Sequence, residues 1–359
     1  MAETVGLRAR RAGRLSGVDA FLWLVRVVAL VAVAWGSYKS ITSGRLTAAQ
    51  WRGLIVAGVS QGAVYALVAL GYTMVYGVLR FINFAHGEVF MAGSMIGFFV
   101  ADGLSGTAMW TSLPFVALLI ALLAAMATST SISLVLERVA YRPLRGLPRL
   151  VPFITAVGAS FFLQYTFAGL FGADSKAYPP VEALKGGFTI VGFRLGKVQA
   201  LVIVATIVMM IGLYLFVERT KAGRAIRAVS EDQEMASLMG INVDRSIALV
   251  FAVGGAMAGA GGLLYGLTFG QVDFLSGFLV GIKAFTASVL GGIGNLAGAM
   301  VGGLVLGLIE SLGPSLVLFG LGVPSAHQLQ DVVAFLALVM ILIFRPTGIL
   351  GERLAEERA

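Results

Sequence analysis

Long apolar runs separated by short polar segments are the main pattern of this chain. Many of the runs exceed the roughly 18 residues with which a helix crosses about 30 Å of hydrocarbon, and they lack the period of two typical of barrel strands. A spanning helix satisfies its own backbone hydrogen bonds in lipid. The pattern therefore predicts an all-α polytopic membrane protein with about 8–10 transmembrane helices. The expected spans lie near residues 20–38, 53–79, 89–101, 113–136, 151–172, 198–217, 246–268, 275–293, 297–319 and 331–344.

The composition agrees with this class of protein. Apolar residues make up 58% and charged residues 12% of the chain, and the mean hydropathy is +0.92, far from the usage of soluble domains. The chain has no cysteine, which excludes a disulfide framework and a thiolate metal site. Basic cytoplasmic loops and attraction to anionic lipid explain the net charge of +8, so a nucleic-acid partner is not required.

The basic residues orient the expected spans. By the positive-inside rule, segments rich in Arg and Lys lie in the cytoplasm. Ten crossings then place both ends of the chain inside, and they place 102–112 and 320–330, which lack Lys and Arg, outside. The segment 173–197 is an exception, because it carries basic residues and would be external. The basic segments assigned to the cytoplasm are 8–14, 137–150, 218–245 and 345–358.

The first part of the chain, 1–50, is a basic extension followed by an extra apolar segment. "RARRAGR" before "FLWLVRVVALVAVAWGS" has the layout of a secretory signal peptide, and "AVA" imitates a cleavage site. Arg26 interrupts the apolar region, which favours an uncleaved first helix. The remaining chain divides into a membrane domain over 51–350 and a short cytoplasmic tail over 351–359.

Glycine is frequent, with 47 residues, and part of it is spaced for helix packing. Steps of the form G-x-x-x-G put two glycines on one helix face and let two backbones approach closely in lipid. Plain packing is the simpler interpretation, and the alternative is that these helices line a gate that slides. The steps are Gly255 and Gly259, Gly298 and Gly302, and Gly303 and Gly307.

The polar stretch "AVSEDQEMASLMGINVDR", residues 228–245, predicts one short helix outside the membrane. Ser230 and Gln233 have the spacing of a capping box at its start. Gly240 stands where a C-terminal cap takes a left-handed conformation. Three apolar residues share one face by their helical spacing. They are Met235, Leu238 and Met239.

This helix would hold only about nine residues between its two caps. Helices of that length are not stable alone in water, so the apolar face must dock on another surface. The residues alone leave two surfaces open: the chain's own bundle or the lipid surface, and a cytoplasmic partner whose groove accepts a Met-rich helix.

The same stretch carries the first part of a resemblance to a known family. "EMASLMG", from Glu234 to Gly240, resembles the E-A-A-x-x-x-G signature with which membrane subunits of ATP-binding-cassette (ABC) importers engage their ATPase subunits. Met235 replaces the middle residue of E-A-A. The resemblance implies that this segment couples transport to ATP hydrolysis. The residues expected to do so are Ser230, Glu234, Met235, Ala236, Leu238, Met239 and Gly240.

Two longer stretches, 58–94 and 285–312, make the resemblance specific. They are similar to the permeases of high-affinity branched-chain amino-acid importers, and 58–94 contains the N-F-A-H-G-E stretch of one of the two permease subunits. Together with 224–262, the resemblance covers residues 52–350. It implies an ABC importer permease-type bundle with interrupted helices and a short cytoplasmic coupling helix, in the bacterial cytoplasmic (inner) membrane.

The resemblance also implies a working assembly. The expected partners are a second homologous permease subunit in a heterodimer, two cytoplasmic ATPase subunits, a periplasmic binding protein that delivers Leu, Ile or Val, and membrane lipid. The chain has no G-x-x-x-x-G-K-[ST] loop, so we expect no enzyme and no bound cofactor, with ATP used by the partner subunits. Similar permeases carry urea, short amides or other amino acids, and no residue of this chain decides among these substrates.

Polar residues interrupt the apolar runs at two places, which is typical of the broken helices that line transporter pathways. "NFAHGEVFMAG" and "NLAGAMVGG" both read Asn, a bulky apolar residue, Ala and then a glycine. This similarity indicates either an internal repeat or a chance match between glycine-rich segments. Asn83 and Asn295 would cap the helices that follow. The candidate path residues are Asn83, His86, Gly87, Glu88, Gly294, Asn295 and Gly298.

The ionisable residues inside the spans are functional candidates, because each is costly in lipid unless it is paired or hydrated. A metal site at His86 is excluded, since no second His or Cys lies at ligand spacing. A catalytic role lacks a nucleophile and a plausible reaction. Lys283 is expected to pair with Glu310 or Asp273 within the bundle.

Two other classes of protein remain open on the residues alone. A secondary transporter or channel would explain the bundle and the buried charges, but it would not explain the capped helix and its importer-like signature. An integral-membrane enzyme would need acid, base or metal ligands clustered at one depth, and this chain is poor in such residues.

Overall fold

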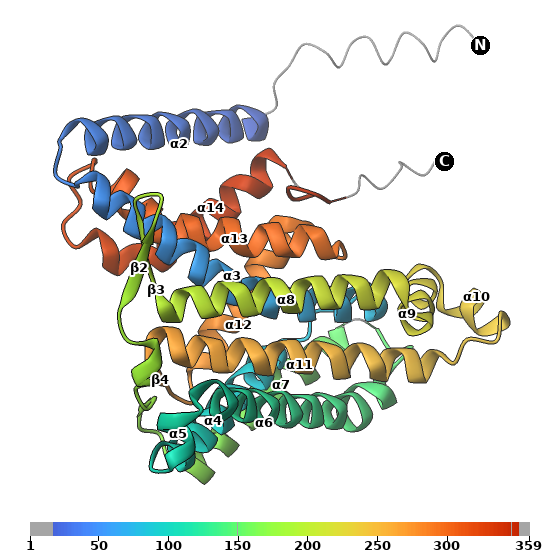
Figure 1. Cartoon of the computed structure of the whole chain (residues 1–359). Helices are drawn as coiled ribbons and strands as arrows, with labels where there is room; N and C mark the ends of the chain where they lie inside the picture. The colour runs from blue at the N-terminus through green and yellow to red at the C-terminus, as the bar shows by residue number, and fades with distance from the viewer. Residues whose placement is uncertain (1–16, 149, 346, 352–359) are drawn as a thin grey trace, which may run out of the picture.

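The computed structural model describes residues 17–148, 150–345 and 347–351, and Figure 1 shows them as a bundle of helices with a few short strands. The basic N-terminal extension up to residue 16 and the tail from residue 352 lie outside the described residues. The prediction of an all-α polytopic protein is confirmed. The strands confined to the loops are β1 (Lys176–Ala177), β2 (Gly187–Ile190), β3 (Phe193–Gly196) and β4 (Gln271–Val272).

Each expected span coincides with one apolar helix. In the described part of the chain, nine helices are long and apolar enough to cross a membrane. The helix Ser276–Gly291 has only 16 residues, so the expected span over 275–293 is a shorter helix than the sequence predicted. The ten helices are α2 (Gly17–Thr42), α3 (Ala48–Leu79), α4 (His86–Ser105), α6 (Pro114–Val135), α7 (Leu150–Phe171), α8 (Lys197–Arg219), α11 (Val243–Phe269), α12 (Ser276–Gly291), α13 (Leu296–Gly313) and α14 (Gln330–Phe344).

Shorter helical turns connect or extend these helices. A π-helical turn prolongs α6 and another prolongs α13, and 3-10 turns fill the loops. The short α-helices are α5 (Ala108–Ser112), α9 (Lys221–Glu231) and α10 (Gln233–Leu238). The π turns are Leu136–Tyr141 and Pro314–Leu318, and the 3-10 turns are Arg142–Leu144, Glu182–Leu184 and Ala326–Leu329.

The centre of the bundle is α3, which contacts α13, α11 and α12 and is almost entirely buried along its second half. Close approach of α3 and α13 depends on glycine. A Cβ on Gly303 would collide with the backbone of Ala66, and one on Gly307 would collide with Gly62. Gly259 packs in the same way against Ala125 of α6. The G-x-x-x-G steps are therefore sites of helix packing in this structure.

Figure 1 shows α6, α8 and α11 running between two ends of the bundle, with the hairpin β2–β3 at one end and α9 and α10 at the other. The hairpin turns through Val191 and Gly192, which both have positive φ. Strand β1 pairs with β4 beside it. Tyr178, just after β1, donates a hydrogen bond of 2.5 Å to the Ser94 carbonyl, and its burial raises the pKa of the phenol. The segment 173–197, which is the exception to the positive-inside rule, thus includes the hairpin and packs at that end of the bundle.

The extra first helix α2 packs on the π turn Pro314–Leu318 that follows α13. Gly36 lies against the backbone of Val317, and the Ser40 hydroxyl donates to the Ser315 carbonyl at 2.7 Å. Arg26, which interrupts the apolar region, donates to the Ile343 carbonyl at 2.7 Å. The arginine is tolerated in an apolar helix because its guanidinium reaches the C-terminal end of α14, where carbonyls lack partners.

Candidate coupling helix and helix breaks

The short helix α10 begins at a different residue from the one predicted. Its N-cap is Asp232, whose carboxylate accepts hydrogen bonds of 2.9 Å from the amides of Glu234 and Met235. The prediction that Ser230 caps this helix is wrong. Ser230 lies in the last turn of α9 and donates to the Arg227 carbonyl at 2.7 Å. The backbone turns extended at Asp232, so the expected helix is divided into α9 and a six-residue α10.

The C-terminal end of α10 follows the predicted geometry. Gly240 has a φ of +80°, and its amide donates to the Ser237 carbonyl at 2.9 Å. The next amide, of Ile241, reaches back to the Ala236 carbonyl at 3.0 Å, so the last carbonyls of the helix are satisfied. A left-handed conformation suits glycine, which has no Cβ to clash. The cap predicted at Gly240 is therefore confirmed.

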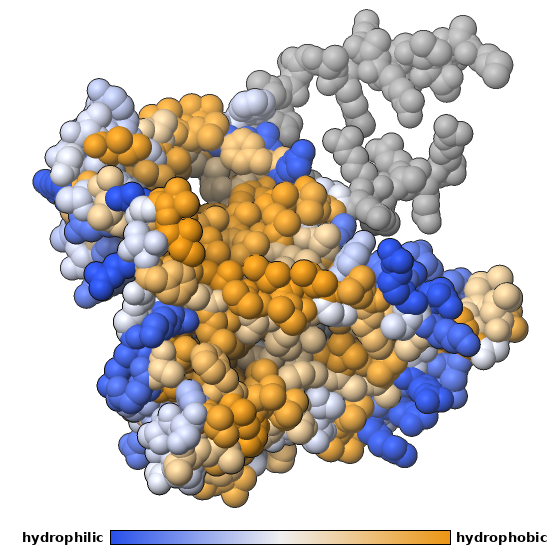
Figure 2. All heavy atoms as spheres, in the orientation of Figure 1, coloured by the Kyte–Doolittle hydropathy of each residue, from blue (hydrophilic) through white to orange (hydrophobic). Residues whose placement is uncertain are grey.

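The apolar face of α10 is largely exposed in the part of the chain that the structure describes. Met235, Leu238 and Met239 are 58%, 76% and 81% exposed, whereas Ala236 on the opposite face is buried. Figure 1 shows α10 projecting from its end of the bundle, and Figure 2 shows apolar atoms at that tip beyond a ring of hydrophilic residues. Docking of this face on the chain's own bundle does not occur in this structure, which leaves the lipid surface and a partner groove as the expected arrangements.

Two side chains tie the junction between α9 and α10 to the end of α3. Gln233 donates to the Val78 carbonyl at 2.7 Å, and Arg80 donates to the Ser230 carbonyl at 2.8 Å. No local sequence pattern predicts these hydrogen bonds, because the two segments are far apart along the chain. A displacement of α10 therefore acts directly on the residues where α3 stops.

The first helix break lies between α3 and α4, and Arg80 ends α3 with a φ of +55°. The prediction that the Asn83 side chain caps α4 is wrong, since the helix starts after Ala85 without a side-chain cap. The Asn83 carboxamide instead accepts a hydrogen bond of 2.6 Å from the Tyr141 hydroxyl, and its backbone carbonyl receives the His86 amide at 3.1 Å. The Asn83 side chain therefore forms a hydrogen bond with a residue distant in the chain and does not cap the helix that follows it.

His86, Gly87 and Glu88 are packed inside the bundle. The His86 ring fills the gap between α3 and α11 left by Gly71 and stands edge-on to Tyr72, with ring centroids 4.8 Å apart. Gly87 lies against α12, where a Cβ would strike the backbone. Glu88 accepts a hydrogen bond of 3.2 Å from Ser160 of α7. Within the described residues, no group of three or more His, Cys, Asp or Glu could hold a metal ion.

The second helix break lies between α12 and α13 and contains Gly292 and Gly294, both with positive φ. Asn295 caps α13 as predicted, accepting the Gly298 amide at 3.0 Å, and its amide group donates to the Leu350 carbonyl at 3.0 Å. Gly298 packs against the Gly291 carbonyl. The similar sequences at the two breaks therefore fold with different capping, and the role of both breaks in a path stays a prediction.

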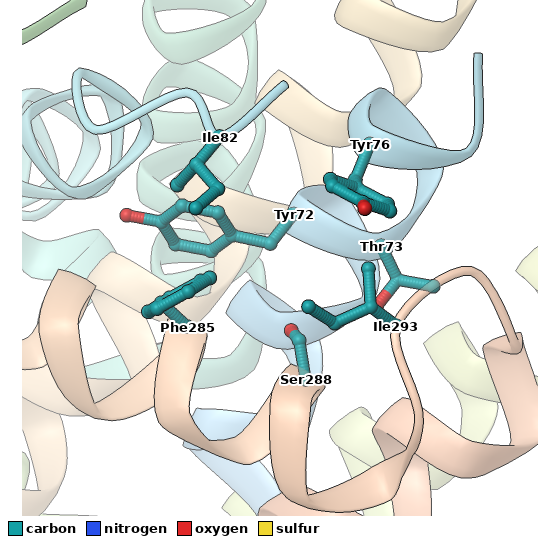
Figure 3. Close-up of a pocket in the computed structure, with 7 residues that line it drawn as sticks. All are labelled: Tyr72, Thr73, Tyr76, Ile82, Phe285, Ser288 and Ile293. Atoms are coloured by element: carbon teal, nitrogen blue, oxygen red, sulfur yellow. The ribbon is translucent and has the colours of Figure 1, made fainter. Parts of the chain in front are cut away.

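The two breaks meet beside α3. Ile82 from the first break and Ile293 from the second line the same small cavity, of about 10 Å³, together with Tyr72 and Phe285. Figure 3 shows the Tyr72 ring lying between Ile82 and Phe285, with Ile293 on the other side of the hollow. A space of this size holds about one water molecule. In this conformation each break therefore contributes one side chain to the lining of the same small hollow.

A cluster of charges joins α12, α13 and α14. The Lys283 ammonium lies 2.6 Å from Glu310 and 2.7 Å from Asp331. The predicted pair of Lys283 with Glu310 is confirmed, and the alternative pair with Asp273 is wrong. Asp273 turns the chain into α12, accepting from the Leu275 amide and the Ser276 hydroxyl at 2.9 Å. Asp331 was missed, although it is the carboxylate that opens the last apolar run.

These features define the class of a polytopic membrane permease: a bundle of spanning helices, two breaks that line one hollow, and a capped helix projecting from one end. Residues 54–343 match the family described as branched-chain amino acid transport system / permease component. The match covers most of the chain, which therefore belongs to this family.

Curated relatives agree with this assignment. The chain is 45% identical over 303 residues to the high-affinity branched-chain amino acid transport system permease protein BraD of Pseudomonas aeruginosa, covering 83% of this chain and 95% of the relative. It is 41% identical over 301 residues to the permease protein LivH of the corresponding Escherichia coli system, covering 82% of this chain and 94% of the relative. No solved structure gives a significant match.

Proposed function

We propose that this chain is the membrane-spanning permease subunit of an ATP-driven importer for branched-chain amino acids. The observation that carries the proposal is the exposed apolar face of α10, held rigidly by caps at both ends. An apolar surface exposed to water does not stabilise the permease chain, whereas a groove on an ATPase subunit would bury it. The names of the relatives support the choice of substrate.

The proposed assembly pairs this chain with a second homologous permease, two ATPase subunits that use ATP, and a binding protein that delivers the substrate. In the bacterial inner membrane, the α10 end faces the cytoplasm. Support comes from the basic residues of α8 and α9 at that end, which include Arg219, Lys221 and Arg224, since cytoplasmic segments carry an excess of Lys and Arg. The hairpin β2–β3 then faces the periplasm.

In this mechanism the ATPase moves α10 as a rigid piece when it closes on nucleotide. Gln233 and Arg80 pass the movement to the end of α3. The first helix break follows α3 directly in the chain. It shares with the second break the hollow that Tyr72 and Phe285 also line. Separation of the two breaks would open a conduit whose apolar walls suit aliphatic side chains, while the helix ends accommodate the charged groups of a zwitterion.

The test uses the full importer reconstituted in vesicles, with uptake and ATP hydrolysis measured together. Leu238→Asp is expected to weaken ATPase docking roughly thirtyfold, because a central apolar contact contributes about 2 kcal/mol. Gly240→Pro is expected to uncouple the two activities, since proline cannot adopt a positive φ. Ile190→Asp at the opposite end is the control, as Ile190 is similarly exposed. Wild-type coupling in both α10 variants would overturn the proposal.

A further inference from the structure

A large hollow lies at the α10 end of the bundle, between the end of α6, the helix α9 and the start of α11. Its volume is about 650 Å³, within the range of about 300–1,000 Å³ typical of ligand sites. Small side chains open it, since Ala222 and Ala225 of α9 face Ala248 and Ala252 of α11 across the space. The proposed coupling and the helix breaks make no use of this pocket.

The lining changes from charged to apolar with depth. Lys221 begins α9 just after the end of the span α8, and Arg245 lies in the first turn of the span α11. Ala252 lies seven residues further along α11 than Arg245, which is about 10 Å deeper at about 1.5 Å per residue. Leu249 and Leu134 line the deeper part. The pocket thus combines two cations at its mouth with an apolar interior.

The carboxylates near the pocket pair with other arginines and not with Lys221 or Arg245. Asp244 pairs with Arg142 and Arg145, and Glu218 pairs with Arg227, and none of these arginines lines the pocket. In the part of the chain that the structure describes, neither Lys221 nor Arg245 takes part in an ion pair. Figure 2 shows hydrophilic residues gathered at this end of the bundle on both sides of an apolar surface. The mouth of the pocket therefore carries positive charge toward the lipid headgroups.

We propose that this pocket binds an anionic phospholipid, with the phosphate between Lys221 and Arg245 and an acyl chain along Leu249 and Ala252. Basic pockets between transmembrane helices at the membrane boundary suit such headgroups. Phosphate favours this pair of cations, because both donate charged hydrogen bonds to its oxygens. The bound lipid contacts α9, which carries α10, so the site lies next to the surface that we propose for ATPase docking.

The test uses the purified full chain, without ATPase or substrate, so its outcome is independent of the proposed transport activity. The chain is equilibrated in detergent with equal amounts of phosphatidylglycerol and phosphatidylcholine, and retained lipid is counted by native mass spectrometry. We expect one tightly held phosphatidylglycerol per chain. The double variant Lys221→Gln/Arg245→Gln is expected to lose retention roughly thirtyfold, since each basic side chain contributes a factor of about five.

Two further variants separate a built pocket from general attraction. Arg219→Gln/Arg224→Gln removes the same charge at the same end of the bundle but outside the lining, and it is expected to retain the lipid. Ala252→Phe keeps every charge and fills the pocket, and it is expected to lose the lipid. Equal losses in both charge variants, or full retention in Ala252→Phe, would show diffuse attraction and overturn the site. Unchanged retention in Lys221→Gln/Arg245→Gln would show that the two cations do not hold the lipid and would also overturn the proposal.

Discussion

Lys283 and Glu310 are ionisable side chains inside the bundle, and each lies within reach of a partner of opposite charge. Lys283 is nearly buried and Glu310 is fully buried, while Asp331, the third member of the cluster, is 43% exposed. A buried charge that loses its partner is far more costly than a buried pair replaced by apolar residues. The energetic value of Lys283 therefore lies in neutralising Glu310, and Asp331 can be hydrated instead.

Lys283→Met is expected to lower the free energy of unfolding by about 3–5 kcal/mol, because Glu310 is left buried without its partner. Lys283→Met/Glu310→Met is expected to recover most of this loss. The measurement is denaturant unfolding of the purified chain in detergent, arranged as a double-mutant cycle. Lys185→Met is the control, since its exposed pair with Glu182 contributes at most about 1 kcal/mol. A double variant no more stable than the single one would contradict this account.

The same residues show what the sequence can predict at this scale. Lys283 and Glu310 were predictable as a pair, because few other charges lie within the spans. Asn83 and Asn295 have similar local sequences, yet only Asn295 is a helix cap. Asn83 accepts a hydrogen bond from Tyr141, which is 58 residues away in the chain, and no local sequence pattern predicts that contact.

Helix ends decide how the elements of this protein are connected. The sequence predicted the positions of the spans, because apolar runs and flanking charges mark them. It predicted a span over 275–293, and the helix α12 ends earlier, at Gly291, because Gly292 and Gly294 take positive φ. It also placed the start of α10 at Ser230, since the capping-box spacing ignores the extended backbone at Asp232.

The cap of α10 is therefore testable by comparing two neighbouring residues. Asp232→Ala is expected to destabilise the helix by about 1 kcal/mol, which raises amide hydrogen exchange at Glu234 and Met235 roughly fivefold. Ser230→Ala is the matched control and is expected to leave that exchange unchanged, because its hydroxyl serves α9. Exchange can be followed by mass spectrometry of the intact chain. Faster exchange at these two amides in Ser230→Ala would restore the sequence-based assignment.

At the scale of the whole molecule, distant segments converge on α3. Glycine lets α13 lie directly against α3, which brings the second break beside the first. The coupling helix reaches the same helix through Gln233. Sequence similarity indicated each of these parts, but their meeting depends on tertiary packing that no single stretch specifies. We expect a working permease to separate the two breaks, which in this conformation line one hollow.

The absence of native cysteine makes that change directly testable. Ile82→Cys/Ile293→Cys places one thiol on each break, and a short bifunctional thiol reagent can then join the two breaks across the cavity that both residues line. In the reconstituted importer, cross-linking is expected to abolish uptake and reduction of the link to restore it, because the breaks can no longer separate. The two single variants, treated identically, should transport at their untreated rate. Undiminished uptake in a fully cross-linked sample would show that the two breaks move as one body and that the substrate crosses elsewhere.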